Sequence, residues 1–352
     1  MKLQVGQFGF RLLLFVGYCG EVPISLVRWM EGYYDYNRRV VTELVRAGYL
    51  KERIFRAEQR HMVRSLSLTE AGLRQIQHLS PNQAAQIRQH LLAPKDGQGN
   101  WRRTHRLRRN AACLLAAIKL GAVWMPGKSQ DAARGKKLVY YSTYHLDKKS
   151  GKDNKSARAS GIFADEYTYY PTYYLGDRNM CWNTETEQQL RDRFELSEIG
   201  RNLHFGGNLL LGDDWALAER IVRHAKNPHS RLIRFTPSNT FYYGTLDRHG
   251  IMLLQAILDG YYSFQLQNWL YERCGCPVTM LPGYLFQLDG IGKPDLNGEE
   301  SNYFFDFQFS TAKKICPPDA NLTSMPSGLL EDFDTAIRTG EDAIWPLHGR
   351  WF

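Results

Sequence analysis

The sequence predicts an α/β (α+β) protein of two domains, in which a small basic helical domain precedes a larger domain with a mixed sheet. The chain has 352 residues, of which 43% are hydrophobic, and this is enough to bury two cores. Residues 1–110 hold 19 lysines and arginines against eight acidic residues, so the net charge of +9 comes from one end. The pattern changes from amphipathic helices before residue 120 to short tyrosine-rich strands after residue 138.

Several broad classes of protein are disfavoured by the composition. The longest apolar runs, 12–16 and 111–120, are shorter than the ~18–20 residues that a bilayer crossing needs. Residues 1–20 lack the small-residue cleavage site of a signal peptide. The six cysteines are scattered and indicate a reducing compartment. We therefore expect a cytoplasmic protein with no membrane partner.

Three helices follow one another in the first 50 residues. The first is predicted over 9–18 and ends before Gly20, and the second over 24–30 follows Pro23. Asp35 is a credible N-cap for a third helix that Gly48 ends. Two short helices joined by a tight glycine-containing turn predict a helix-turn-helix.

The polar face of the third helix carries residue types that read DNA grooves. Arginine can bind guanine through two hydrogen bonds, and asparagine can do the same with adenine. An ordinary solvated basic face is the alternative. The candidate DNA-binding residues of this helix are Tyr36, Asn37, Arg38, Arg39, Thr42 and Arg46.

A predicted hairpin comes next. Strand-like alternation over 49–55 and 62–67 surrounds a basic tip, and Thr69 is placed to cap a further helix. The candidate DNA-binding residues of the hairpin are Arg56, Arg60 and Arg64. The order of three helices, a hairpin and a Leu-Thr-Glu-Ala-Gly helix start resembles the winged-helix domains of the MarR and PadR regulators over residues 8–80. The resemblance implies a domain that binds double-stranded DNA.

The domain junction is predicted in the polar, glycine-containing segment 94–100. We divide the chain into a winged-helix DNA-binding domain over 1–92, a basic linker over 93–110 and a mixed α/β domain over 111–352. The linker is expected to bind phosphates without reading sequence, unless its charges merely begin a solvated helix. Its arginines are Arg102, Arg103, Arg106, Arg108 and Arg109.

The C-terminal domain alternates strands and helices. Strands are predicted over 138–144, 159–164, 167–174, 203–211, 232–235, 241–243, 284–288 and 303–309, and helices over 185–194, 214–224 and 248–259. The strand tyrosines either fill a sheet or form a surface on which bases stack. These tyrosines are Tyr140, Tyr141, Tyr144, Tyr169, Tyr170, Tyr173 and Tyr174.

A winged helix followed by such a domain resembles the replication-relaxation proteins of plasmids and conjugative elements. The stretch from Ser160-Gly161-Ile162-Phe163 to Met180-Cys181-Trp182-Asn183 is also similar to accessory proteins of such mobile genetic elements. What the resemblance implies is DNA binding in replication, transfer or transcription regulation by repression. The oligomeric state stays open, a homodimer included.

One constellation suggests enzyme chemistry. Asp295 precedes an apolar strand that contains Asp306 and Gln308. Nucleases of the PD-(D/E)xK kind hold a divalent ion between two such carboxylates, with a lysine where Gln308 stands. The alternative to a DNA-binding protein without cofactor is therefore a Mg²⁺-dependent nuclease. A third hypothesis is an inhibitor that binds another protein through its C-terminal domain. The sequence has no P-loop, dinucleotide-binding glycine fingerprint, zinc-ligand spacing or nucleophile elbow.

Overall fold

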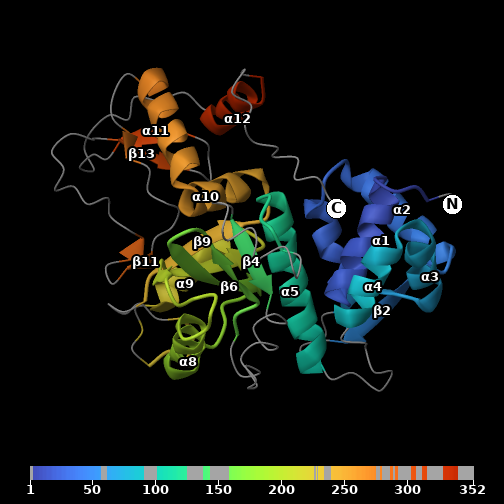
Figure 1. Ribbon diagram of the computed structural model, residues 1–352. Coiled ribbons are helices and arrows are strands. Elements are labelled where there is room, and N and C mark those ends of the chain that lie inside the picture. Colours follow the sequence, from blue (N-terminus) through green and yellow to red (C-terminus); the bar gives the residue numbers. More distant parts are fainter. Residues whose placement is uncertain are drawn as a thin grey trace. The chain divides into compact units, whose positions relative to one another are not determined.

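The chain is mixed α/β and divides into two compact units in a computed structural model (Figure 1). The first unit extends to Leu115 and the second begins at Ala116, and each is described by itself. The structure describes residues 3–56, 62–90, 101–124, 138–142, 158–225, 227, 229–233, 239–274, 278–279, 286–287, 290–291, 303–306, 311–314 and 328–339.

The first unit is built around α1 (Phe8–Cys19), whose leucines, phenylalanines and valine are buried on nearly all sides. Gly20 ends this helix with a φ of 74°, and its N–H bonds the carbonyl of Val16. The first predicted helix is thus confirmed. The second is a 3₁₀ helix, η1 (Ile24–Trp29), of which Leu26 and Val27 are buried.

The third helix, α2, covers Tyr34–Arg46 and packs against the unit through Val40, Val41 and Leu44. Tyr33 is its N-cap residue, and no side chain bonds the first-turn amides there. The prediction of Asp35 as the N-cap is therefore wrong, since Asp35 already lies in the first turn. An acidic side chain at that place still interacts favourably with the positive end of the helix dipole.

A hairpin follows α2. Strands β2 (Leu50–Arg56) and β3 (Met62–Leu68) pair antiparallel, and β1 (Val22–Pro23) joins the other edge of β3 in the order β1-β3-β2. The hydroxyl of Thr69 accepts a hydrogen bond from the N–H of Gly72 at 3.0 Å, which confirms its predicted capping role. The elements that then follow are α3 (Glu70–Leu79), α4 (Pro81–His90) and α5 (Trp101–Lys119).

The second unit has a mixed sheet in the order β12-β11-β9-β8-β6-β5-β4, with β7 beside β6. Strands β4, β5 and β6 form an antiparallel meander, while β6, β8 and β9 are parallel. The bounds are β4 (Val139–Ser142), β5 (Gly161–Ala164), β6 (Thr168–Gly176), β7 (His204–Phe205), β8 (Asn208–Gly212), β9 (Phe241–Thr245), β11 (Phe286–Gln287) and β12 (Gly290–Ile291).

Two crossover helices, α8 (Thr184–Glu195) and α9 (Ala216–Ala225), connect the parallel strands. Strand order advances in one direction from β6 to β8 to β9, so right-handed crossovers place both helices on the same face of the sheet. A single buried cluster confirms this placement, because it joins Leu190 of α8 and Leu217 of α9 to Tyr173 of β6 and Tyr243 of β9.

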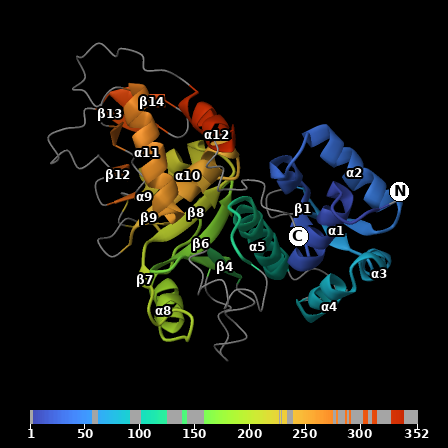
Figure 2. The ribbon, with the colours of Figure 1, turned by 45° about the horizontal axis from the view of Figure 1, so that its top comes forward.

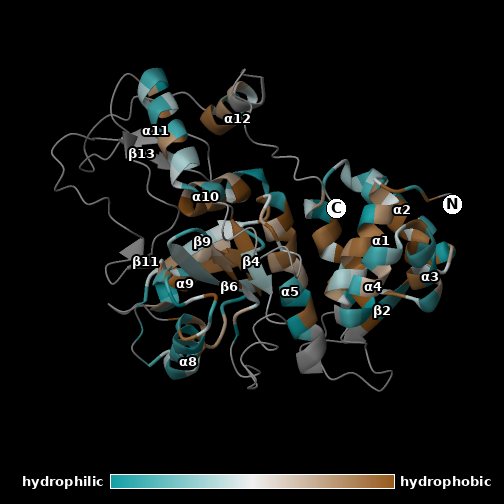
Figure 3. Cartoon of the chain, viewed as in Figure 1, coloured by the Kyte–Doolittle hydropathy of each residue, from teal (hydrophilic) through white to brown (hydrophobic). Residues whose placement is uncertain are grey.

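Three further helices share a second buried cluster, in which Leu253, Leu266 and Phe333 take part. These helices are α10 (Arg248–Leu258), α11 (Gly260–Cys274) and α12 (Leu329–Thr339), and α11 and α12 lie together in Figures 1 and 2. Most of α10 is coloured as hydrophobic in Figure 3, as expected for a helix with few exposed positions. A separate sheet has the order β10-β13-β14, with β10 (Val278–Thr279), β13 (Tyr303–Asp306) and β14 (Thr311–Lys314).

Most predicted elements of the second domain correspond to observed ones, and residues 232–235 are an exception. Within 232–235, the described residues form only an isolated bridge, between Leu232 and Cys181, rather than a strand. Five of the strand tyrosines are buried and fill the sheet, so they offer no stacking surface. They are Tyr140, Tyr141, Tyr169, Tyr170 and Tyr173.

Candidate nucleic-acid interface

The exposed face of α2 gathers most of the DNA-binding residues predicted on this helix. Val40 and Leu44 recur at helical spacing and point into the core, which leaves the opposite side of the helix to solvent. The exposed side chains include Tyr36, Arg38, Arg39, Thr42 and Arg46. Because Arg38, Arg39 and Arg46 share this exposed surface, α2 presents a positively charged surface to solvent.

The two arginines near the start of α2 lie against aromatic rings. The Cζ atom of Arg38 is 5.6 Å from the centroid of the Tyr34 ring, and that of Arg39 is 5.8 Å from the centroid of the Tyr36 ring. Arg39 also lies 3.9 Å from the carboxylate of Glu43, one turn further along. Cation–π contacts of this kind orient a guanidinium while its N–H groups still point outward.

Asn37 does not belong to this face, although the sequence predicted that it would read bases. Its side chain is completely buried, and its Nδ2 donates a hydrogen bond to the carbonyl of Glu31 at 3.0 Å. The amide therefore fixes the turn that leads into α2. The hydroxyl of Thr42 remains on the exposed face but donates to the carbonyl of Arg38 at 3.0 Å.

The hairpin contributes less than predicted within the described residues. Arg64 is exposed, but its guanidinium binds both carboxylate oxygens of Glu52 on the paired strand. This hydrogen bond lowers the pKa of Glu52. Arg60 and the side chain of Arg56 lie outside the described residues.

The arginines predicted as a linker lie on α5, and Arg108 among them is not available to DNA. Arg108 and Glu21 are only 5% and 2% exposed, and their Nη2 and Oε1 atoms are 3.5 Å apart. Nη2 of Arg108 donates to Oγ of Ser65 at 3.0 Å, and this hydroxyl donates in turn to Glu21. Burial lowers the pKa of Arg108, and the nearby Glu21 carboxylate opposes that shift.

The other four arginines of α5 stay candidates for phosphate contacts. Arg106 and Arg109 are half-buried, and the side chains of Arg102 and Arg103 lie outside the described residues. Residues 101–110 are helical, so the predicted linker is in large part the first half of α5. The first compact unit extends to Leu115, beyond the predicted boundary at residue 92.

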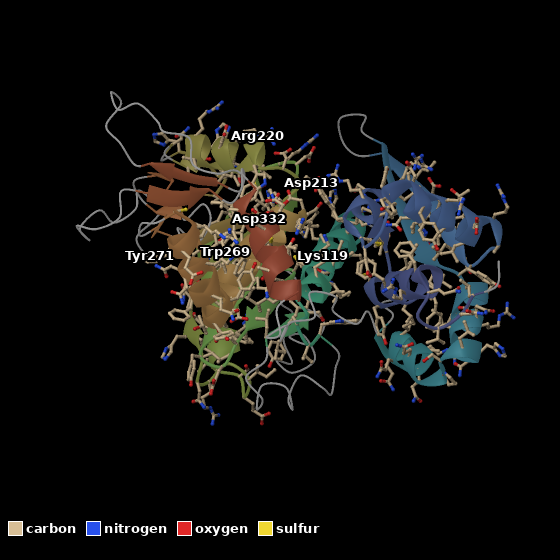
Figure 4. The ribbon with its side chains drawn as sticks, turned by 90° about the horizontal axis from the view of Figure 1, so that it is seen from above. Lys119, Asp213, Arg220, Trp269, Tyr271 and Asp332 are labelled. Carbon is tan, nitrogen blue, oxygen red and sulfur yellow. The ribbon has the colours of Figure 1, made fainter. Side chains whose placement is uncertain are left out.

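A second polar cluster lies where the parallel strands of the other unit end. Asp213 follows β8 and accepts a hydrogen bond from the hydroxyl of Tyr174 on β6. Arg220 of α9 donates to the carbonyl of Asp177 at 3.0 Å and lies 3.9 Å from the Asp214 carboxylate. Figure 4 labels Asp213 and Arg220 in this cluster. Ligands often bind at such carboxyl ends, but these polar groups already bind one another.

Lys119, also labelled in Figure 4, is the last residue of α5. Its Nζ donates to the carbonyl of Leu246 at 2.7 Å, beside the Asp247 that caps α10. Burial lowers the pKa of Lys119 to about 8, while the Asp247 carboxylate opposes this shift. The Nζ atom therefore ties the end of α5 to a strand-to-helix turn of the second unit.

The nuclease residues cannot be assembled from the described part of the chain. Asp295, Gln308 and the side chain of Asp306 lie outside it, while the backbone of Asp306 ends β13 opposite Thr311 of β14. Among the described residues, no group of three or more histidine, cysteine and acidic side chains is arranged to hold a metal ion. A Mg²⁺ site at these residues stays a prediction.

The structure also reveals exposed aromatic rings that the sequence analysis did not single out. Tyr33 and Tyr34 lie three and two positions before Tyr36, and three tyrosines within four positions at the start of a helix could have been noticed in the sequence. On α11, exposed rings recur on one side at Tyr261, Phe264 and Tyr271, the last labelled in Figure 4.

No helix within the described ranges combines the length and the apolar character that a membrane span requires. Comparison of the chain with protein-family models, with curated proteins and with solved structures finds no match.

Proposed function

We propose that the first unit is a winged helix-turn-helix that binds double-stranded DNA through the exposed face of α2. The order of α1, η1, α2 and the β2–β3 hairpin supports this proposal. So does the small sheet, in which β1 leads from α1 into η1 and pairs with β3. In helix-turn-helix proteins, the second helix of the motif enters the major groove and its first turns contact the base edges.

The observation that carries the proposal is the exposure of Arg38, Arg39 and Arg46 on one helix whose opposite face is buried. A surface helix of about ten ångströms in diameter fits the major groove. The surrounding residues 1–110 hold 19 basic against eight acidic side chains, which favours attraction to phosphate. Arg106 and Arg109 would extend the contact along the DNA backbone without reading sequence.

The biological setting that we propose is a mobile genetic element, such as a plasmid or conjugative element. The resemblance of the sequence to replication-relaxation proteins supports a role there in replication, transfer or transcriptional repression. The C-terminal unit would then bring the DNA-bound protein to its partner or to a second copy. Sequence specificity, if it comes from α2, depends on Arg38 and Arg39 rather than on the buried Asn37.

The test is a binding titration with fluorescently labelled duplexes, in which bound sequences are first selected from a random pool. Arg38→Ala and Arg39→Ala should each weaken binding to the selected duplex by about 1–3 kcal/mol if the guanidinium binds a base edge. Arg74→Ala and Arg88→Ala are matched controls, because these arginines are exposed on α3 and α4 of the same unit. Equal affinity of all four variants and the native protein would refute the interface.

A further inference from the structure

The start of α2 displays three tyrosines to solvent. Tyr33 is 88% exposed, and Tyr34 and Tyr36 are each 47% exposed. We call these three residues the tyrosine cluster. Three exposed aromatic rings within four residues are more than the singly scattered apolar side chains that a protein surface normally shows. The sheet tyrosines of the second unit, such as Tyr169 and Tyr173, are by contrast buried.

Two rings of the tyrosine cluster are held in place by their neighbours. Tyr36 lies between Phe8, at a centroid distance of 6.2 Å, and the guanidinium of Arg39. Tyr34 lies under the guanidinium of Arg38. Tyr33 precedes the first turn, and its carbonyl accepts the N–H of Asn37 at 3.0 Å. The backbone of Tyr33 is therefore fixed while its ring extends into solvent.

Apart from its arginines, the start of α2 offers few groups that can read base edges by hydrogen bonding. The amide of Asn37 is buried, and the hydroxyl of Thr42 donates to the helix backbone. What remains at the start of the helix is a set of ring faces and guanidinium groups. A ring face can stack on another flat surface, and a guanidinium can bind a phosphate or the edge of a guanine.

An intact duplex does not offer the flat surface of a base, because its bases are stacked on one another and show only their edges in the grooves. Base faces become accessible at a gap, a fork or a hairpin loop, where one strand is unpaired. Aromatic side chains beside basic ones are the usual means of binding such bases. The arginines of α2 would still bind the adjoining duplex as proposed above.

We propose that the tyrosine cluster stacks on an unpaired base next to the duplex that α2 binds, so that the preferred ligand is a junction between double-stranded and single-stranded DNA. The inference rests on the proposed function, since α2 must first bind duplex DNA. Tyr33 and Tyr34 supply the stacking faces, and Arg38 and Arg39 bind the adjoining duplex.

The experiment compares three DNA probes of the same sequence with the full chain at fixed salt: an intact duplex, the duplex with a gap of about three nucleotides, and the single strand. A fluorescent base analogue in the gap reports stacking directly. The gapped duplex should bind about tenfold more tightly than the intact duplex. Tyr33→Ala and Tyr34→Ala should each reduce that preference and the quenching of the analogue, while Tyr33→Phe and Tyr34→Phe retain both.

The control variant is Tyr261→Ala, which removes a similarly exposed ring from α11 of the other unit and should change nothing. Unchanged thermal unfolding of each variant shows that the fold is intact. Equal affinity for gapped and intact duplex, or a preference that survives both alanine variants, overturns the inference and leaves the proposed function standing. The proposed function fails separately if no duplex binds or if binding does not depend on Arg38 and Arg39.

Discussion

The α2 face and the cluster at the carboxyl ends of the parallel strands both gather charged side chains, but they use them differently. In the strand-end cluster, Arg220 binds the carbonyl of Asp177 and Asp213 accepts from Tyr174. On α2, Arg38 lies over a tyrosine ring, and its guanidinium makes no hydrogen bond within the described part of the chain. The density of charge alone therefore does not identify an interface. What matters is whether the donors are already bound within the protein.

The largest effect on stability is expected at the buried ion pair of Glu21 and Arg108. Glu21→Ala leaves the guanidinium of Arg108 buried without its carboxylate, so we expect the free energy of unfolding to fall by about 3–5 kcal/mol. Urea denaturation of the full chain measures this decrease. Glu52→Ala is the control, because it breaks the exposed pair with Arg64 and should cost no more than ~1 kcal/mol. Similar decreases in both variants would contradict the distinction between buried and exposed pairs.

Asn37 lies on α2 but is buried, and its side chain bonds the protein backbone rather than facing solvent. Asn37→Ala removes the hydrogen bond to the carbonyl of Glu31, and we expect unfolding to become easier by about 1–2 kcal/mol. At a temperature where the variant is folded, the sequence selected from random duplexes should match that of the native protein. A changed base preference in the folded variant would show that Asn37 contacts DNA and would reverse our assignment.

Lys119 is a partly buried charged residue, and we expect it to make the free energy of unfolding depend on pH. Its pKa falls from 10.5 to about 8 on folding, so between these pH values the unfolded chain holds a proton that the folded chain has released. The free energy of unfolding should therefore rise with pH through this group from pH 8 towards 10. Buried tyrosines act in the opposite sense above pH 10, since burial raises the pKa of Tyr141 and Tyr242.

The measurement is the thermal midpoint of unfolding at several pH values between 7.5 and 9.5. Lys119→Met should lose the rise in stability that Lys119 contributes, whereas Lys51→Met, which changes an exposed lysine, should keep it. If the thermal midpoints of both variants follow the pH profile of the native protein, Lys119 does not titrate in this range. Its ammonium is then better solvated than its burial indicates.

The smallest effect concerns two half-buried arginines of α5. Replacing Arg106 and Arg109 by alanine should flatten the dependence of DNA affinity on salt, by about one unit of logarithmic slope for each phosphate that is no longer bound. Selected and random duplexes should weaken alike, because phosphate contacts carry no sequence information. An unchanged slope together with reduced solubility would show that these arginines are only a solvated part of the helix.

The sequence predicted local features well and distant pairings poorly. The cap at Thr69 was readable because its hydroxyl bonds an amide three residues away. The role of Arg108 was not, since its partner Glu21 lies 87 positions earlier and the surrounding arginines suggested an exposed run. Asn37 was misread because its residue type suits a groove, whereas its burial depends on how the turn at Glu31 packs.

The helices α11 and α12 were missed for a related reason. Their buried residues, among them Leu266, Leu270 and Leu330, form one cluster with α10, and that packing favours a helix where the local pattern is weak. The candidate nuclease residues were proposed from the sequence, and their side chains lie outside the described residues.

Helix α5 carries residues of both compact units, and this limits where the gene can be divided. Arg108 completes the core of the first unit, and Lys119 of the same helix belongs to the second. A recombination event that transferred only residues 1–92 to another gene would deliver the Glu21 carboxylate without its cation. A gene fragment that encodes the complete core of the first unit must therefore extend into the codons of α5, and a crossover within that helix leaves one recipient with an incomplete core.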